Sequence, residues 1–530
     1  MKKIENNKTN NEEMITISRA EYENLKAQSR RVSELEGRVD LLTEALRLSR
    51  HKKFGASSET ISEDAAEQLS FLFNEAEAYD DAAKEEEKAT TVAAHKRHKK
   101  HEYTLDNVPE NVPVEEVHHT LEGDELTCPN CGETMTEIGK EVVNTLELIP
   151  AKVVVKKHIY YTYACKKCNN EGIETPVRKA AREKNIIPGS FSTPEAIAHI
   201  MTQKFVMGSP LYRQEQELNR QGIMLSRQTM SNWILKASQM YLEPVYEEFH
   251  RELLKREVLH ADETTLQVLH EPGKEPQSKS YMWLYRTSGD TDKPVVMYEY
   301  QPGRGAVHPK EFLEGFKGCL HTDGYAGYHN LPQDITVVGC WAHLRRKFDE
   351  AMKSLPKGKA KNSSAAQGLA YCTLLFEIEK GLSQLEPQER YTQRLKQEKP
   401  VLDAFFAWAN VRNAAPKSAL GKALTYLKEQ WPYLTNYLKD GRLELSNNRA
   451  ERSIKPFVID RKNFMFANTP GGAKGSAVIF TMIQTATENH LDPYKYLVWL
   501  LKTASTADMK NPDMIKSLLP WNAPAECKIK

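Results

Sequence analysis

Apolar residues in the first fifty positions recur at steps of three and four. This spacing is typical of heptads, so we predict a coiled coil at residues 15–50, which would make the protein a homo-oligomer. A single amphipathic helix that packs on its own chain is the alternative. The predicted seam positions are Leu25, Gln28, Val32, Leu35, Val39, Leu42 and Leu46.

Residues 60–105 contain an acidic run followed by a basic run, which predicts a solvated linker. Apolar and polar positions then alternate from Val153 to Tyr163, as in strands. A Cys-x-x-Cys pair lies on each side of this stretch, and four thiolates suit a closed tetrahedral Zn²⁺ site. Redox-active or coincidental cysteines are the alternative. We predict a structural zinc ribbon at residues 106–180, with Cys128, Cys131, Cys165 and Cys168 as ligands.

The apolar spacing becomes helical between residues 185 and 245. Two amphipathic segments flank a turn that contains Gly222, and Ser226 suits the N-cap of the second segment. This order predicts a helix-turn-helix whose second helix enters a DNA major groove, and plain helical packing is the alternative. The side chains predicted to contact base edges are Arg227, Gln228, Thr229 and Asn232.

A strand pattern begins after Arg256 and continues to Cys340, interrupted by a helix predicted at 309–316. Three strands, a helix and further strands match the order of a ribonuclease-H-like fold. We place this catalytic domain at residues 250–470, with a helical insertion at 355–440 because that segment exceeds the fold's minimum. A C-terminal helical segment would follow at 471–530, and the chain as a whole would be multidomain α+β. The predicted strands are 258–269, 281–287, 294–301, 318–325 and 335–340, and the insertion helices are 365–384, 388–410 and 418–439.

Three carboxylates lie at positions where such a fold gathers acidic side chains. Asp262 is on the first strand, Asp323 ends the fourth, and Glu451 is on the helix after the insertion. A buried carboxylate is costly unless it is paired or binds a metal ion, and phosphodiester chemistry uses two hard cations such as Mg²⁺ or Mn²⁺. We therefore predict a catalytic metal-binding triad. Each acid taken alone also suits an ordinary surface or capping role.

Glu263 directly follows Asp262, and neighbours on a strand face opposite ways. Asp262 fits the metal-facing position better, but the sequence leaves the reverse open. His260 and His321 each precede an aspartate by two positions and so share its strand face. We hypothesise that these imidazoles orient the carboxylates or a phosphate. Core histidines satisfied by the backbone are the alternative.

The segment around Glu451 is basic, although the formal net charge of the chain is only +1. Seven Lys or Arg against three acids lie in residues 442–474, which predicts a surface for the DNA backbone. The segment Thr469–Gly475, "TPGGAKG", is predicted to be a flexible loop near DNA. The basic residues predicted to contact DNA are Arg449, Arg452, Lys455, Arg461 and Lys462.

At 530 residues the chain is too long for one compact core. Its other four cysteines are scattered, which favours a reducing compartment over a disulfide framework. The N-terminus has no apolar core typical of a signal peptide, and no apolar run is long enough to span a membrane. We therefore expect a cytoplasmic protein, associated with the bacterial nucleoid when bound to DNA, and no membrane partner.

Several specific strings occur in order along the chain: "FGASSE", "HADET", "HTDGYAGY", "CWAHLRRKF" and "SNNRAERSIKPF". On these strings, together with the zipper, ribbon and helix-turn-helix patterns, the chain resembles a DDE transposase of the insertion sequence 66 family. The resemblance implies that Asp262, Asp323 and Glu451 form the metal-binding triad. It also implies binding to the terminal inverted repeats of the element, followed by strand cleavage and transfer into target DNA. Small accessory proteins from the same element are implied as partners.

One position departs from the family pattern, because many relatives have Asp-Asp-Thr where this chain has Asp262-Glu263-Thr264. Cys340 and His343 resemble the Cys-x-x-His pair that follows the second aspartate in several DDE transposases with helical insertions, and strand-end packing is the alternative. Two other functions stay open. One is a nuclease that cuts without joining, and the other is a DNA-binding regulator whose transposase domain is inactive.

Overall fold

The computed structural model describes residues 26, 153–159, 161–164, 177–179 and 184–529. The predicted coiled coil, apart from Lys26, lies outside the described residues. So do the predicted linker and the four predicted zinc ligands, Cys128, Cys131, Cys165 and Cys168.

Two short strands belong to one compact unit, residues 74–182. Strand β1 (Thr162–Ala164) pairs antiparallel with β2 (Val177–Lys179). Residues 153–159 are irregular and exposed, so the strand predicted there from period-two alternation is wrong. Alternation marks a strand only where one face is buried, and Val154 and Val155 are 71% and 81% exposed.

A mixed five-stranded sheet lies at the centre of residues 184–529, which belong to the second compact unit. Its order is β5-β4-β3-β6-β7; β4 pairs antiparallel with both β5 and β3, and β6 pairs parallel with both β3 and β7. The central strand, β3, carries Asp262. The strands are β3 (Val258–Gln267), β4 (Lys279–Thr287), β5 (Val296–Gln301), β6 (Gly318–Thr322) and β7 (Ile335–Gly339), and the short helix α8 (Val307–Phe312) precedes β6.

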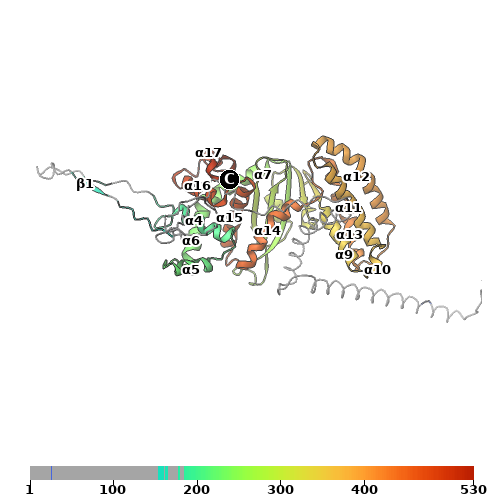
Figure 1. Cartoon of the computed structure of the whole chain (residues 1–530), viewed down its shortest axis with the longest axis horizontal. Coiled ribbons are helices and arrows are strands. Elements are labelled where there is room, and N and C mark those ends of the chain that lie inside the picture. Colours follow the sequence, from blue (N-terminus) through green and yellow to red (C-terminus); the bar gives the residue numbers. More distant parts are fainter. Residues whose placement is uncertain (1–25, 27–152, 160, 165–176, 180–183, 530) are drawn as a thin grey trace, which may run out of the picture. The chain divides into compact units, whose positions relative to one another are not determined.

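Two long helices pack against the sheet. Helix α14 (Asn448–Phe464) crosses β3 and β4, and α15 (Pro470–Glu488) lies along β5 (Figure 1). The Thr481 and Thr485 hydroxyls accept hydrogen bonds from the Tyr298 and Val296 amides, at 2.9 and 3.1 Å. These bonds satisfy backbone groups that an edge strand would otherwise leave unpaired.

Helix α15 begins within the segment predicted to be a flexible loop, so that prediction is wrong. The Thr469 side chain accepts from the Gly472 amide, and Pro470 occupies the first helical turn. Gly475 approaches helix α6 so closely that a Cβ atom there would lie 2.6 Å from Leu235 Cδ2. The glycines therefore serve a tight helix contact, and composition alone gave the wrong local structure.

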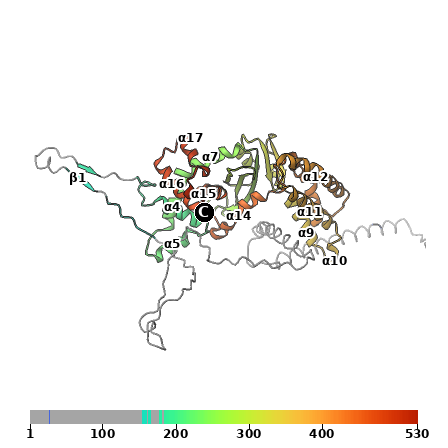
Figure 2. The ribbon, with the colours of Figure 1, turned by 45° about the horizontal axis from the view of Figure 1, so that its top comes forward.

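One hydrophobic core joins the sheet to the helices before and after it in the sequence. Ser226 caps α6 as predicted, since its side chain accepts from the Thr229 amide. Figure 2 shows α4, α5 and α16 gathered on one side of the sheet. The helices of this group are α4 (Pro194–Phe205), α5 (Leu211–Arg220), α6 (Arg227–Ala237), α7 (Glu243–Leu254), α16 (Pro493–Thr506) and α17 (Pro512–Ser517).

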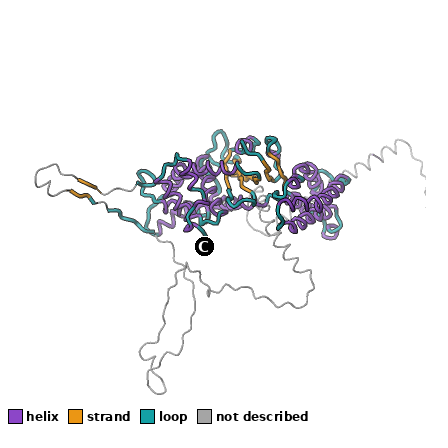
Figure 3. Tube along the Cα trace, turned by 90° about the horizontal axis from the view of Figure 1, so that it is seen from above, coloured by secondary structure: helices purple, strands orange, loops and turns teal. Residues whose placement is uncertain are grey.

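A second core forms where the helical insertion was predicted. Buried Arg394 donates to Glu379 and to the carbonyl oxygens of Tyr437 and Leu443, which fixes the segment that leads into α14. The strands lie between the two helical groups (Figure 3). No described helix is long and apolar enough to cross a membrane. The helices around this second core are α9 (Trp341–Lys353), which precedes the predicted insertion, and α10 (Lys357–Ala360), α11 (Ser364–Leu382), α12 (Pro387–Asn410) and α13 (Ala419–Leu434).

Candidate active site

The register of two parallel strands places the predicted aspartates side by side. His260 of β3 lies opposite His321 of β6, so Asp262 and Asp323 each follow two residues later on the same strand side. Asp323 comes directly after β6, where its Oδ1 accepts a 2.9 Å hydrogen bond from the Tyr325 amide. Gly324 makes this turn with φ +91°, and a Cβ there would lie 2.7 Å from the Tyr426 hydroxyl. The turn therefore requires glycine.

Glu263 is buried at this edge, Asp262 and Asp323 are half-buried, and the charges of the carboxyls repel one another. Burial raises the pKa of Asp262 well above its usual value, and the charges of Asp323 and Glu263 raise it further. Burial also raises the pKa of Asp323 and brings that of Glu263 to about 7. Bound cations would offset both burial and repulsion, so the site's electrostatics suit a divalent metal ion.

Glu263 is held by two partners that Asp262 does not share. Its Oε1 accepts from Arg304 Nε at 2.8 Å, and its Oε2 accepts from the Tyr328 hydroxyl at 2.6 Å. Asp262 Oδ1 instead accepts from the Glu263 amide at 2.8 Å. The Glu263 carboxylate is thus occupied by protein donors, which favours Asp262 as the residue available to a metal ion.

The sequence analysis missed Arg304. Besides binding Glu263, its guanidinium lies 3.9 Å from the centroid of the Tyr325 ring, and its carbonyl oxygen accepts from the Tyr325 hydroxyl. Arg304 therefore links β3 to the turn that holds Asp323. An arginine between Gly303 and Gly305 was the one signal in the sequence that marked this position.

The two predicted histidines contact each other and the segment before α14. Both are buried, and burial lowers the pKa of His260 to about 3 and that of His321 well below its usual value. His260 Nδ1 donates to Asn447 Oδ1 at 3.0 Å, and His321 Nε2 accepts from the Glu444 amide at 3.3 Å. These neutral rings connect the strands that carry the aspartates to the N-terminus of the helix that carries Glu451.

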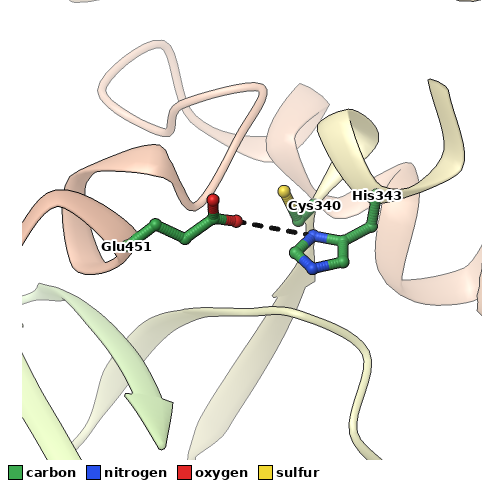
Figure 4. Close-up of side chains that lie close together, drawn as sticks. All are labelled: Cys340, His343 and Glu451. Carbon is green, nitrogen blue, oxygen red and sulfur yellow. Dashed lines mark ion pairs between the residues drawn. The ribbon is translucent and has the colours of Figure 1, made fainter. Parts of the chain in front are cut away.

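Glu451 lies in the first turn of α14 and points toward Cys340 and His343 (Figure 4). One oxygen, nitrogen or sulfur atom from each of the three residues lies within 4.8 Å of the others, and His343 Nδ1 is 3.7 Å from Glu451 Oε1. Within the described residues, this trio is the group of His, Cys, Asp and Glu side chains close enough to share one metal ion.

Tyr426 lies near both Asp323 and Glu451. The Tyr426 hydroxyl donates to the Asp323 carbonyl oxygen at 2.8 Å. Burial raises the Tyr426 pKa well above its usual value, and the charges of both Asp323 and Glu451 raise it further. The structure thus brings two of the predicted carboxylates to adjacent strands at one edge of the sheet, whereas Glu451 points toward Cys340 and His343.

The predicted DNA-contacting residues differ in their surroundings. On α6, Arg227, Gln228 and Asn232 are exposed and Thr229 is half-buried. On α14, Arg452 and Lys462 are exposed, and Lys455 is half-buried. Arg449 and Arg461 instead have partners within the protein, since Arg449 Nε donates to Glu444 at 2.8 Å and Arg461 Nη1 donates to Thr265 Oγ1 at 2.9 Å.

A known family model covers the part of the chain that holds the predicted carboxylates. The model of the Transposase IS66 family matches residues 189–475, which include Asp262, Asp323 and Glu451. The chain belongs to the IS66 transposase family. This confirms the resemblance drawn from its sequence strings.

Two further family models match the N-terminal part of this IS66 transposase. The zinc-finger binding domain of transposase IS66 matches residues 125–169 and spans all four predicted zinc ligands, which supports a structural Zn²⁺ ion there. The model described as Transposase C of IS166 homeodomain matches residues 41–117.

Relatives of this IS66 transposase occur in Sinorhizobium fredii (strain NBRC 101917 / NGR234). The uncharacterized protein y4qI is 30% identical over 97% of this chain and 94% of its own length. The uncharacterized protein y4hP is 31% identical over 74% of this chain and 73% of its own length.

Proposed function

We propose that this IS66 family transposase is a DDE-type polynucleotidyl transferase that binds the terminal inverted repeats of its element, cuts there and joins the ends to target DNA. One observation carries the proposal: Asp262 and Asp323 follow paired residues of the adjacent parallel strands β3 and β6, and Glu451 lies in the first turn of the helix that packs across β3. The sheet order, three antiparallel strands joined to two parallel ones, supports a ribonuclease-H-like fold for this domain.

The donor set fits Mg²⁺ or Mn²⁺. Asp262 and Asp323 offer carboxylate oxygens, the ligands these hard cations prefer, and their mutual repulsion is relieved by positive charge. Glu451 would complete the set. When bound, two such ions activate the attacking oxygen and stabilise the leaving oxygen in phosphodiester chemistry.

The chain's own residues would fix the geometry of the carboxylates. Gly324 and the Tyr325 amide orient Asp323, while Arg304 and Tyr328 hold Glu263 away from the metal side. Asn447 donates from Nδ2 to the Ala261 carbonyl oxygen at 2.8 Å, so the α14 N-terminus is attached to β3 next to Asp262. Prearranged groups of this kind require little reorganisation during the reaction.

DNA would be bound by separate surfaces. Helix α6 presents Arg227, Gln228 and Asn232 to solvent, which supports base contacts by a helix-turn-helix. Arg452 and Lys462 are the exposed basic residues of α14 and would contact phosphates near the carboxylates. The domain boundaries predicted from the sequence, the coiled-coil homo-oligomer and the accessory proteins remain part of the proposal.

Product analysis tests this function. Full-length protein, labelled end DNA and Mg²⁺ should give joined products, and Asp323→Asn should abolish them. Asp334→Asn, which changes an exposed aspartate of the same domain, should not. Cleavage without joining would support a nuclease instead, and DNA binding without either product would support a regulator.

A further inference from the structure

We propose that Lys347 of α9 and Lys422 of α13 bind one backbone phosphate of the DNA end beside the turn that carries Asp323. The inference rests on the proposed function, because it requires a DNA end at the catalytic carboxylates. Both lysines lie on helices of the second core, outside the segments predicted from the sequence to contact DNA. These helices would therefore contribute to substrate binding as well as to the bulk of the domain.

Tyr426 connects the two helices to the catalytic edge. It lies on α13 one turn after Lys422, and its hydroxyl donates to the Asp323 carbonyl oxygen at 2.8 Å. The Lys347 ammonium lies over the face of the same ring, 4.9 Å from the centroid. Because α9 and α13 pack side by side, a single phenol ring spans the gap between the Lys347 ammonium and the Asp323 turn.

The Lys347 ammonium has the surroundings of an anion-binding group. Among the described residues, no carboxylate lies within ion-pairing distance of it. Burial lowers the pKa of Lys347, the charge of Glu350 raises it, and the charge of Lys422 lowers it. Arg346 and Asp323 have smaller effects, which lower and raise the pKa respectively. A phosphate would supply the negative charge that this partly dehydrated cation lacks.

The two lysines are placed so that a phosphate can reach both. Lys422 is exposed, and Lys347 and Tyr426 are half-buried. Lys422 and Tyr426 are four residues apart and so share one face of α13, the face over which the Lys347 ammonium lies. Each ammonium offers three donors, so the pair can share the non-bridging oxygens of one phosphate. A phosphate held there would position the neighbouring phosphodiester at the carboxylates.

The salt dependence of DNA binding tests the charge of Lys347. Lys347→Met keeps an apolar side chain over Tyr426 but removes the charge. In full-length protein it should weaken binding of labelled end DNA about tenfold and reduce the slope of log affinity against log salt by about 0.9. Lys347→Arg keeps the charge and should retain the wild-type slope.

Lys353→Met is the matched control, since it removes a lysine charge from the same helix at a position that pairs with Asp349 at 2.8 Å. It should leave both affinity and slope unchanged. A wild-type slope in Lys347→Met would overturn the inference, even if affinity fell, because a purely structural role for the lysine would change affinity without changing the number of phosphates neutralised.

A neutral phosphate analogue locates the contact on the DNA. End DNA that carries one methylphosphonate, placed in turn at each position around the cleavage site, should bind wild-type protein about tenfold more weakly at one position. At that position Lys347→Met and Lys422→Met should each bind the analogue no more weakly than wild-type protein does. Additive losses at every position would overturn the inference.

The inference and the proposed function can fail separately. Wild-type protein that joins DNA, with an unchanged salt slope in Lys347→Met, would refute the phosphate contact alone. Protein that shows the contact in both binding measurements but never cuts or joins DNA would refute the proposed activity and leave the contact in place.

Discussion

The imidazole rings of His260 and His321 stack with their centroids 4.3 Å apart and their planes 11° from parallel. The stack joins β3 to β6 two residues before Asp262 and Asp323, and both rings are fully buried and neutral. Each ring also hydrogen-bonds to the segment before α14. The buried histidine pair therefore connects β3 and β6 to the segment that leads into the Glu451 helix.

Asn447 is the partner of His260 in this contact, and we expect Asn447→Ala to loosen α14. The substitution removes the bonds to His260 and to the Ala261 carbonyl oxygen and leaves both groups buried. Loss of such buried partners costs about 1–3 kcal/mol of unfolding free energy. Denaturant unfolding measures the cost, and the exposed Asn522→Ala serves as the control. Equal costs for the two variants would show that the Asn447 bonds contribute nothing.

Gly324→Ala should displace Asp323. The new alanine would have to adopt φ +91°, and its Cβ would lie 2.7 Å from the Tyr426 hydroxyl. Backbone strain of this kind costs about 1–3 kcal/mol, and we expect strand transfer to fall at least about tenfold. Gly273→Ala separates strain from contact, because Gly273 has φ +72° with nothing within 4 Å of its added Cβ. If both variants lost the same activity, the Tyr426 contact would not matter.

Arg304→Ala should destabilise the protein, because it leaves the buried Glu263 carboxylate without its cation. The Arg304 side chain is 41% exposed, so solvent screening reduces the loss to roughly 1–2 kcal/mol. Adding Glu263→Gln should recover most of that loss, since the amide carries no charge. A double-mutant cycle by thermal unfolding measures the coupling, and additive losses would refute the pairing.

Stability should depend on pH through Glu398, a carboxyl in the insertion that accepts from the Tyr437 hydroxyl at 2.7 Å. Burial raises its pKa from 4.5 to about 8, so between these values the folded state binds a proton that the unfolded state has released. The protein therefore loses stability as pH rises through this window, on the order of 1 kcal/mol per pH unit. Above pH 8 the loss is complete.

Glu398→Gln should remove this part of the pH dependence. Unfolding free energies at pH 5 and pH 8 measure the effect for the wild type and the variant. Glu389→Gln, an exposed position on the same helix, should leave the slope unchanged. A wild-type slope retained in Glu398→Gln would assign the dependence to another group.

The sequence predicted the strands well because β3 to β7 are buried and strongly patterned. Once β3 and β6 pair in parallel, the backbone register alone aligns Asp262 with Asp323. Local composition failed at Thr469–Gly475, where packing of Gly475 against Leu235 determines the structure. Period-two alternation failed at residues 153–159, where both faces are exposed.

Contacts across long stretches of sequence could not be predicted. Arg304 acts through a loop that folds back over β3, and the Cys340–His343–Glu451 trio forms only once the insertion returns the chain to the sheet. Arg461 was predicted as a DNA contact from its charge, yet it donates to Thr265 of β3. Charge identifies a basic segment but does not tell which of its side chains have partners inside the protein.

The central claim is that Asp262, Asp323 and Glu451 jointly hold the ions that drive DNA joining. Strand-transfer rates in Mg²⁺ test it most directly. Asp262→Asn, Asp323→Asn and Glu451→Gln should each lower the rate at least about 10³-fold, while Glu263→Gln should lower it far less and Asp334→Asn not at all. Near-wild-type joining by any of the first three variants would contradict the account.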